Sequence, residues 1–139
     1  MKKILVPIDG SHNSLEALKW ARDMAEKYGS QIIILNIQKP VSYITPETIS
    51  LREDPNLFAK IGEKVIDAGL EAIKGTTVEV KTEVNFGDPA EQILDVIDKE
   101  DVDVVVMGSQ GITGIKKFLI GSVSNKILMH SSKPVMIIK

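Results

Sequence analysis

The chain has 139 residues, the size of one ordinary domain, so we expect residues 1–139 to form a single domain. Hydrophobic residues make up 43% of the chain and aromatic residues 4%, so the core must be aliphatic, and a formal net charge of −2 argues against electrostatic binding to nucleic acid or to a membrane surface. The sequence contains no cysteine, which excludes disulfides, thiolate chemistry and cysteine-ligated zinc.

Five short apolar runs predict five β-strands. Four of them are nearly continuous, as is typical of parallel strands that are buried on both faces, whereas the third alternates apolar and polar residues and should lie near a sheet edge. No signal-peptide core precedes the first run and no run approaches membrane-spanning length, so we expect a cytoplasmic protein. The expected strands are residues 4–8, 32–37, 78–86, 102–107 and 135–138.

Helical patterns fill the first two large gaps between these strands. Ser11 is placed to cap a helix that Gly29 ends. A second helical stretch covers residues 57–74 and is closed by Gly75. The apolar positions that repeat at helical spacing in this second stretch are Ile61, Val65, Leu70 and Ile73.

The last two helices carry clearer start signals. Asp88 can act as an N-cap with Pro89 at the first helical position, and the final helix should begin near Gly121 and Ser122 and stop before Pro134. Strands that alternate with helices of this length predict an α/β domain whose parallel sheet is joined by right-handed crossovers.

One connection is unusually long. Residues 39–55 contain Pro40, Pro46 and Pro55 and show no strong period. A loop of this length is usually functional or mobile, but it can equally be a tolerated surface insertion. The sequence leaves both interpretations open.

A glycine-rich segment, residues 108–111, follows the fourth strand, and nine residues further along Gly121 and Ser122 open the last helix. Glycines let backbone N–H groups approach a phosphate closely, and a helix N-terminus adds unpaired N–H groups and a partial positive charge. Ser109 and Ser122 add hydroxyl donors. Each glycine alone could simply form a turn, but the set, placed between a buried strand and a helix, favours phosphate binding.

Other phosphate-binding motifs do not fit the sequence. It has no G-x-x-x-x-G-K-[ST] segment, which excludes a P-loop NTPase, and no G-x-G-x-x-G after the first strand, which disfavours a dinucleotide-binding fold. The spacing Gly108-x2-Gly111-x9-Gly121-Ser122 instead resembles the ATP-binding signature of the universal stress protein family. The similarity covers essentially the whole chain, including residues 3–11, 87–90, 103–109 and 133–135, although Gln110 stands where the family more often has histidine or arginine.

This resemblance implies a three-layer, doubly wound five-stranded sheet of order 3-2-1-4-5, like that of the adenine-nucleotide α-hydrolases, with the site between strands one and four. It implies ATP as ligand, with Mg²⁺ bound through the phosphates rather than at a metal site of the protein. The residues that would line the nucleoside are Pro7, Ile8 and Asp9, with Ile37 against the adenine. The residues that would follow the ribose and phosphates are Met107, Gly108, Ser109, Gly111, Gly121, Ser122 and Val123.

The leading functional hypothesis is a regulatory, stress-response binding module in which ATP occupancy acts as a switch for protein partners or for the dimer state. We identify no catalytic residue, because the sequence offers no Walker lysine, arginine finger or placed base. The alternative is a slow ATPase or a nucleotidyl-transfer enzyme in which Asp9 positions water or a metal; Asp9 could also be simply an acid at a helix N-terminus. The apolar strand 135–138 predicts a homodimer, since a last strand at a sheet edge exposes unpaired backbone groups.

Overall fold

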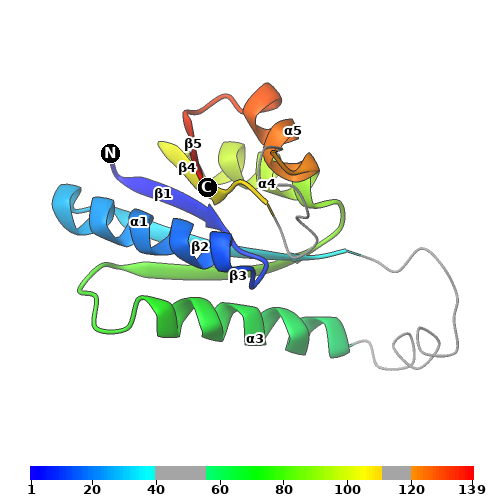
Figure 1. Ribbon diagram of the computed structural model, residues 1–139, viewed down its shortest axis with the longest axis horizontal. Coiled ribbons are helices and arrows are strands. Elements are labelled where there is room, and N and C mark those ends of the chain that lie inside the picture. Colours follow the sequence, from blue (N-terminus) through cyan, green and yellow to red (C-terminus); the bar gives the residue numbers. More distant parts are fainter. Residues whose placement is uncertain (40–55, 111–119) are drawn as a thin grey trace, which may run out of the picture.

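The computed structural model describes residues 1–39, 56–110 and 120–139 (Figure 1). The expected strands and helices are confirmed, with ends that shift by one or two residues. None of the helices in these three segments is long and apolar enough to cross a membrane. The elements in chain order are β1 (Lys3–Pro7), α1 (His12–Tyr28), β2 (Gln31–Gln38), α3 (Leu57–Ala72), β3 (Val80–Phe86), α4 (Pro89–Glu100), β4 (Val104–Gly108), α5 (Ser122–His130) and β5 (Val135–Ile138).

The strands form one parallel sheet in the order β3-β2-β1-β4-β5, as expected. From β1 the chain builds outward through β2 to β3, then returns to the other side of β1 to build β4 and β5. The topology therefore reverses between β1 and β4, and in open α/β sheets ligands bind in the crevice outside the carboxyl ends of the strands at such a point.

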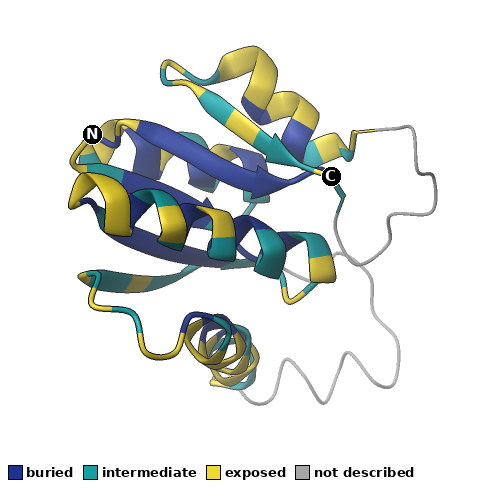
Figure 2. Cartoon of the chain, turned by 60° about the vertical axis from the view of Figure 1, so that its left-hand side comes forward, coloured by how far each residue is buried: buried dark blue, intermediate teal, exposed yellow. Residues whose placement is uncertain are grey.

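One apolar cluster lies on each face of the sheet and packs it against helices, so the fold has three layers. Residues such as Ile4 pack with Ala17 of α1 and Ile66 of α3 on one face, and Leu5 packs with Ile93 of α4 on the other. Figure 2 shows the central strands in the dark blue of buried residues and the outer faces of the helices in yellow. Burial on both faces explains why the central strands are almost continuously apolar, and β3, at the sheet edge, has the half-buried pattern that its alternation predicted.

The packing face of α3 agrees with the expected apolar positions only in part: Ile73 is buried in the core and Val65 packs against it. Ile61 and Leu70 are 38% and 39% exposed, and the helix turns Gly62, Ile66 and Gly69 toward the sheet instead. The two glycines lack side chains, so this face allows the helix backbone to approach the sheet closely. Apolar periodicity therefore identified the helix and part of its buried face, but not the glycines at the centre of that face, because glycine carries no hydrophobic signal.

The helix ends follow their local sequence signals. Ser11 is the N-cap of α1 and its hydroxyl accepts from the Ser14 N–H at 3.3 Å, while Gly29 ends the helix with a φ of 68°. Asp88 caps α4 by accepting from the Glu91 N–H at 3.1 Å, with Pro89 in the first turn.

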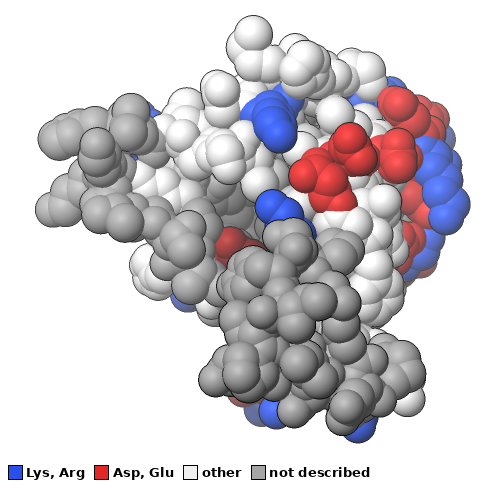
Figure 3. Space-filling view, turned by 90° about the vertical axis from the view of Figure 1, so that its right-hand side faces the viewer, with Lys and Arg blue, Asp and Glu red and all other residues white. Residues whose placement is uncertain are grey.

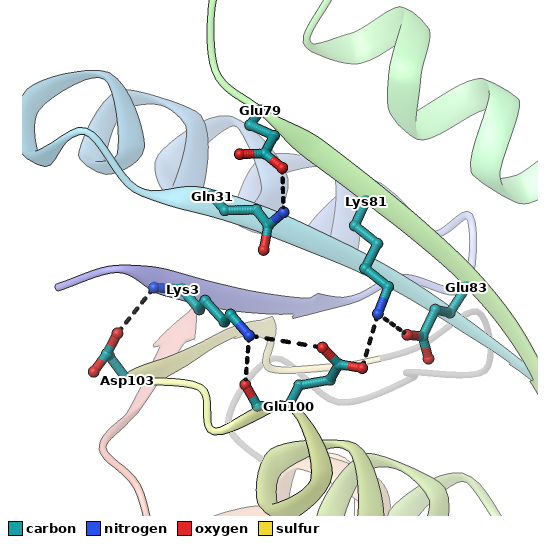
Figure 4. Close-up of polar contacts among 7 residues, drawn as sticks. All are labelled: Lys3, Gln31, Glu79, Lys81, Glu83, Glu100 and Asp103. Atoms are coloured by element: carbon teal, nitrogen blue, oxygen red, sulfur yellow. Dashed lines mark hydrogen bonds and ion pairs between the residues drawn. The ribbon is translucent and has the colours of Figure 1, made fainter.

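A polar network joins β1, β3 and the last turn of α4 (Figure 4). Lys81 Nζ lies 2.9 Å from Glu83 Oε1 and 2.8 Å from Glu100 Oε1, and Lys3 Nζ donates to the Glu100 carbonyl oxygen at 2.9 Å. The hydrogen bond from Lys81 lowers the pKa of Glu100, and the same bond raises the pKa of Lys81. This network links the edge strand β3 to α4, which covers one face of the sheet.

Asp103 holds the start of β1 and provides a first test of stability. One of its carboxylate oxygens accepts the backbone N–H groups of Lys2 and Lys3 at 2.7 and 2.9 Å, and these bonds lower the pKa of Asp103. We expect Asp103→Ala to lower the free energy of unfolding by about 1 kcal/mol at neutral pH, a charged hydrogen bond discounted for solvent exposure.

The pH dependence of this loss has a definite sign. A carboxylate whose folded pKa is depressed stabilises the protein above its unfolded pKa of about 3.9, and this contribution is lost as the pH falls through the folded pKa. Urea titrations should therefore show wild type and Asp103→Ala converging below about pH 4. A difference that stayed constant down to the acid limit would assign the loss to packing instead of to the charge.

Candidate functional site

The candidate site is the crevice that the topology predicts at the carboxyl ends of β1 and β4, on the side of the molecule that faces the viewer in Figure 3. Acidic side chains gather on the right of this face, with basic side chains beside them at the edge of the view, while other basic side chains lie singly nearer its centre. Among residues 1–39, 56–110 and 120–139, no three carboxylate, histidine or cysteine side chains form a group that could hold a metal ion.

The β1 rim of the crevice is the corner between β1 and α1. The Ile8 N–H donates to the Leu35 carbonyl oxygen at 2.8 Å and so extends the pairing with β2 beyond the end of β1. Asp9 follows, and its Oδ1 accepts from the Ser11 N–H at 2.9 Å while its own N–H donates to Ser14 Oγ at 3.4 Å. The carboxylate thus engages the start of α1 through one oxygen, as the interpretation of Asp9 as a helix N-terminal acid requires.

The β4 rim is the segment that Gly108 and Ser109 form. The Ser109 N–H donates to the Ile138 carbonyl oxygen at 2.8 Å, which ties this end of β4 to β5. Ser109 Oγ accepts from Asn13 Nδ2 at 3.3 Å, so a side chain from the first turn of α1 bonds to the β4 rim. The hydroxyl proton of Ser109 is not used in that bond, because the oxygen is the acceptor.

Gly108 is required by packing at this rim. A Cβ atom built on Gly108 would lie 2.8 Å from the Asn13 carbonyl carbon, 2.9 Å from the Asn13 Cβ and 3.0 Å from the Ser14 nitrogen. These are atoms at the start of α1, so the missing side chain lets the N-terminus of this helix rest against the end of β4. The glycine therefore shapes the crevice before any ligand enters.

The N-terminus of α5 returns to the same rim. The Gly121 N–H donates to the Ser109 carbonyl oxygen at 2.7 Å, and the Asn125 N–H donates to the Gly121 carbonyl oxygen at 2.9 Å. As N-cap, Gly121 has no side chain with which to satisfy the first-turn amides of α5, which include that of Ser122. These amides and the positive end of the helix dipole lie next to the β4 rim.

The structure brings most of the expected site residues to these two rims, but with different exposure. Gly111 lies outside the described residues, as do residues 40–55 of the long loop. The side chains of Ile8 and Met107 are buried in opposite apolar clusters, so they can offer a ligand mainly their backbone. The expected site residues that are partly or fully exposed are Pro7, Asp9, Ile37, Gly121, Ser122 and Val123.

Three polar residues at the rims were not assigned to the site from the sequence. Asn13 lies in the first turn of α1, and its side chain reaches Ser109. Ser124, 4% exposed, donates its hydroxyl to the Gly108 carbonyl oxygen at 2.8 Å, and Asn36, 2% exposed, donates its amide to the Ile8 carbonyl oxygen at 2.9 Å. The one available signal for Asn36 was a polar residue within an otherwise apolar strand.

Comparison with known proteins places this fold in a family. The sequence profile described as the universal stress protein family matches residues 1–139. Universal stress protein YxiE of Bacillus subtilis is 31% identical over 145 residues, which cover 99% of this chain and 98% of that protein. The solved structure of the protein MJ0577, from Methanocaldococcus jannaschii, is similar with a TM-score of 0.80 and 30% identity, covering 99% of this chain and 95% of that one.

Two more distant structures share the fold and are described with ligands. The universal stress protein from Archaeoglobus fulgidus in complex with dAMP has a TM-score of 0.72 at 21% identity and covers 100% of this chain and 98% of that one. A universal stress protein family protein from Arabidopsis thaliana with AMP bound has a TM-score of 0.73 at 20% identity and covers 100% and 92%. At these identities the likeness shows the common fold.

Proposed function

Because the chain belongs to the universal stress protein family, we propose that it binds an adenine nucleotide, ATP with Mg²⁺, in the crevice between β1 and β4. Nucleotide occupancy then acts as a signal in a stress response, read by a protein partner or by the dimer state. That solved structures of this fold are described as complexes with dAMP and AMP supports this class of ligand.

The observation that carries the proposal is the junction of β4 with α5. The 2.7 Å bond from the Gly121 N–H to the Ser109 carbonyl oxygen brings the glycine-capped N-terminus of α5 to the topological switch point. Free first-turn amides and a helix dipole at this point favour an anion. The phosphates would lie here, between Gly108 and Ser122, with the Ser109 and Ser122 hydroxyls as further donors.

The β1 rim suits the nucleoside. Pro7, Ile8 and Asp9 would border the ribose and base, with the partly exposed side chain of Ile37 against the adenine. Asp9 has one carboxylate oxygen engaged by Ser11, and the other could accept from a ribose hydroxyl. In this arrangement Mg²⁺ would be held through the phosphates.

Nucleotide binding is tested by calorimetry with ATP and Mg²⁺, together with mass spectrometry of any nucleotide released when the purified protein is denatured. We expect saturable ATP binding by the wild type and its loss in Gly111→Val, because a branched side chain would prevent close backbone approach to a phosphate. The unfolding midpoint of the variant serves as the control for folding. Equal ATP affinity in the two proteins would contradict the proposed phosphate cradle.

The same preparation distinguishes a switch from an enzyme. Enzymes typically turn over at about 1–10³ s⁻¹, and we expect phosphate release far below this range. Release within it that Asp9→Ala abolished would establish the enzyme instead.

We further propose a homodimer that pairs the β5 strands of two copies. β5 lies at the sheet edge, and the bond from the Ser109 N–H to the Ile138 carbonyl oxygen shows which residues face β4. Because backbone groups alternate in direction along a strand, those of Val135 and Ile137 point away from the sheet and are available to a second strand. Two-fold pairing closes on itself and gives a dimer.

The dimer is tested by a charge at the centre of this strand. Met136 is 38% exposed, and Met136→Asp should shift the protein to monomer in sedimentation equilibrium, because two copies of a new charge would approach each other across the two-fold axis. Leu70→Asp on α3, a residue of 39% exposure, is the matched control and should leave the dimer intact. A monomeric wild type at micromolar concentration would refute the proposal.

A further inference from the structure

We infer that Asn36 is a positioning residue of the crevice: its buried side chain fixes the Ile8–Asp9 peptide at the β1 rim and thereby sets the affinity for adenine nucleotide. This inference rests on the proposed function and names a residue that acts through the backbone of the site. Asn36 lies near the end of β2, opposite the point at which the chain leaves β1 for the crevice.

The Ile8–Asp9 peptide is held from both sides. On the β2 side, Asn36 Nδ2 donates to the Ile8 carbonyl oxygen at 2.9 Å. On the α1 side, the Asp9 N–H donates to Ser14 Oγ at 3.4 Å, and Ser14 is itself buried. Because the carbonyl and the N–H belong to one planar peptide, fixing both groups fixes the orientation of that plane and the direction in which Asp9 continues.

The Asn36 amide is itself oriented by its neighbours. Gln38 Nε2 donates to Asn36 Oδ1 at 2.7 Å, which assigns the oxygen to that side and the nitrogen to Ile8. Gly62 of α3 covers the same oxygen, since a Cβ atom built there would lie 3.0 Å from Oδ1. The side chain therefore has a single well-defined orientation.

An amide at this position needs a reason beyond packing. Asn36 is 2% exposed and shares its sheet face with Ile32 and Ile34, which belong to the apolar core under α1 and α3. An apolar side chain would pack there without desolvating an amide, and a buried amide is tolerated because its groups are bonded. The distinct contribution of asparagine is the bond to the peptide that forms the crevice rim.

The test compares Asn36→Leu with Ser30→Ala. Leucine keeps the number and branching of the side-chain heavy atoms but removes the amide, so cavity formation does not obscure the loss of the hydrogen bond. Ser30 is the matched control, because it is also buried, at 4% exposure, and lies just before the start of β2, at the end of the strand opposite Asn36. Its hydroxyl donates to the Met1 carbonyl oxygen, next to the start of β1, at 2.9 Å. Three quantities are measured for each protein: the free energy of unfolding in urea, the Kd for ATP with Mg²⁺, and the ¹⁵N chemical shift of the Asp9 amide, which reports on the Ile8 carbonyl.

We expect Asn36→Leu to move the Asp9 ¹⁵N shift and to raise the Kd for ATP roughly tenfold, the equivalent of one lost hydrogen bond. Ser30→Ala should change stability while leaving both the Asp9 shift and the Kd at wild-type values. A folded Asn36→Leu with the wild-type Asp9 shift and Kd would overturn the inference.

Two further outcomes are decided by the same measurements. If Asn36→Leu does not fold, Gln38→Ala, which removes the bond to Asn36 Oδ1 at a half-buried position, replaces it; a displaced Asp9 shift supports the inference and an unchanged one refutes it. If the wild type binds no ATP, the proposed function fails and the stated effect of Asn36 on affinity fails with it. If the wild type and Asn36→Leu bind ATP with the same affinity, the inference alone is refuted.

Discussion

Replacing Gly108 with alanine should lower the free energy of unfolding by roughly 2–3 kcal/mol, and it should weaken ATP binding at least tenfold if the proposed function is correct. The added methyl group would meet Asn13 and Ser14 at 2.8–3.0 Å, closer than a Cβ atom normally approaches a heavy atom. Two of the three contacted atoms belong to the backbone, so no side-chain rotation can relieve the contact. Either the start of α1 or the end of β4 must move.

Movement of either element disturbs several other contacts. α1 is anchored by buried residues such as Leu18 and Ala21, and the Gly108 carbonyl oxygen accepts from Ser124 at 2.8 Å. A shift that relieves the methyl group therefore strains the packing of α1 or pulls β4 away from α5. Both changes alter the spacing of the two rims that would hold the nucleotide.

Urea titrations and ATP calorimetry of Gly108→Ala check this prediction. Gly121→Ala is the control for stability: its φ is −61°, which alanine adopts readily, and its Cβ atom would lie 3.2 Å from the Ser109 carbonyl oxygen, a less severe contact. We expect it to cost less than about 1 kcal/mol. If Gly108→Ala were as stable as the wild type, the start of α1 could move to accommodate the methyl group. The close packing at Gly108 would then not explain why glycine is found at this position.

The fold was largely predictable because its signals are local. Short apolar runs predicted the strands, and helical periodicity between them predicted the helices. Capping residues such as Ser11 and Asp88 marked two helix starts that the structure confirms. The strand order came from the family resemblance. The packing face of α3 was predicted only in part: Val65 and Ile73 contact the core, but Gly62 and Gly69 act through the absence of a side chain, and Ile61 is exposed although it is apolar.

The site was less predictable because its contacts are long-range. The glycine spacing indicated phosphate binding, but the packing reason for Gly108 depends on Asn13, which is distant in sequence. Asn36 and Ser124 each hold the carbonyl group of a rim residue, and a buried polar side chain within an apolar element has no sequence pattern that names its partner. Such contacts follow from the register between strands and helices, which local sequence does not contain.

Gly62→Ala should lower the free energy of unfolding by about 2 kcal/mol, against the trend of helix propensity. Alanine in a helix interior is favoured over glycine by about 1 kcal/mol, so an exposed site would gain stability. At Gly62 the new Cβ atom would lie 2.5 Å from Val84 Cγ1 and 3.0 Å from Asn36 Oδ1. Overpacking of a core costs typically about 1–3 kcal/mol, and here it should exceed the propensity gain because valine is β-branched and cannot easily rotate away.

A second glycine of the same helix separates the two effects. At Gly69 the nearest atom to a new Cβ is Ile8 Cδ1 at 2.7 Å, the far end of a flexible side chain that can move, so Gly69→Ala should be close to neutral. The clash at Gly62 is then isolated by a double-mutant cycle with Val84→Ala, which removes the contacting methyl groups. We expect the double variant to lose clearly less than the sum of the two single losses, since the contact between neighbours makes their effects non-additive. Strict additivity in urea titrations would mean that α3 moves away from the sheet as a whole, and the close packing of this helix on β3 would then contribute little to stability.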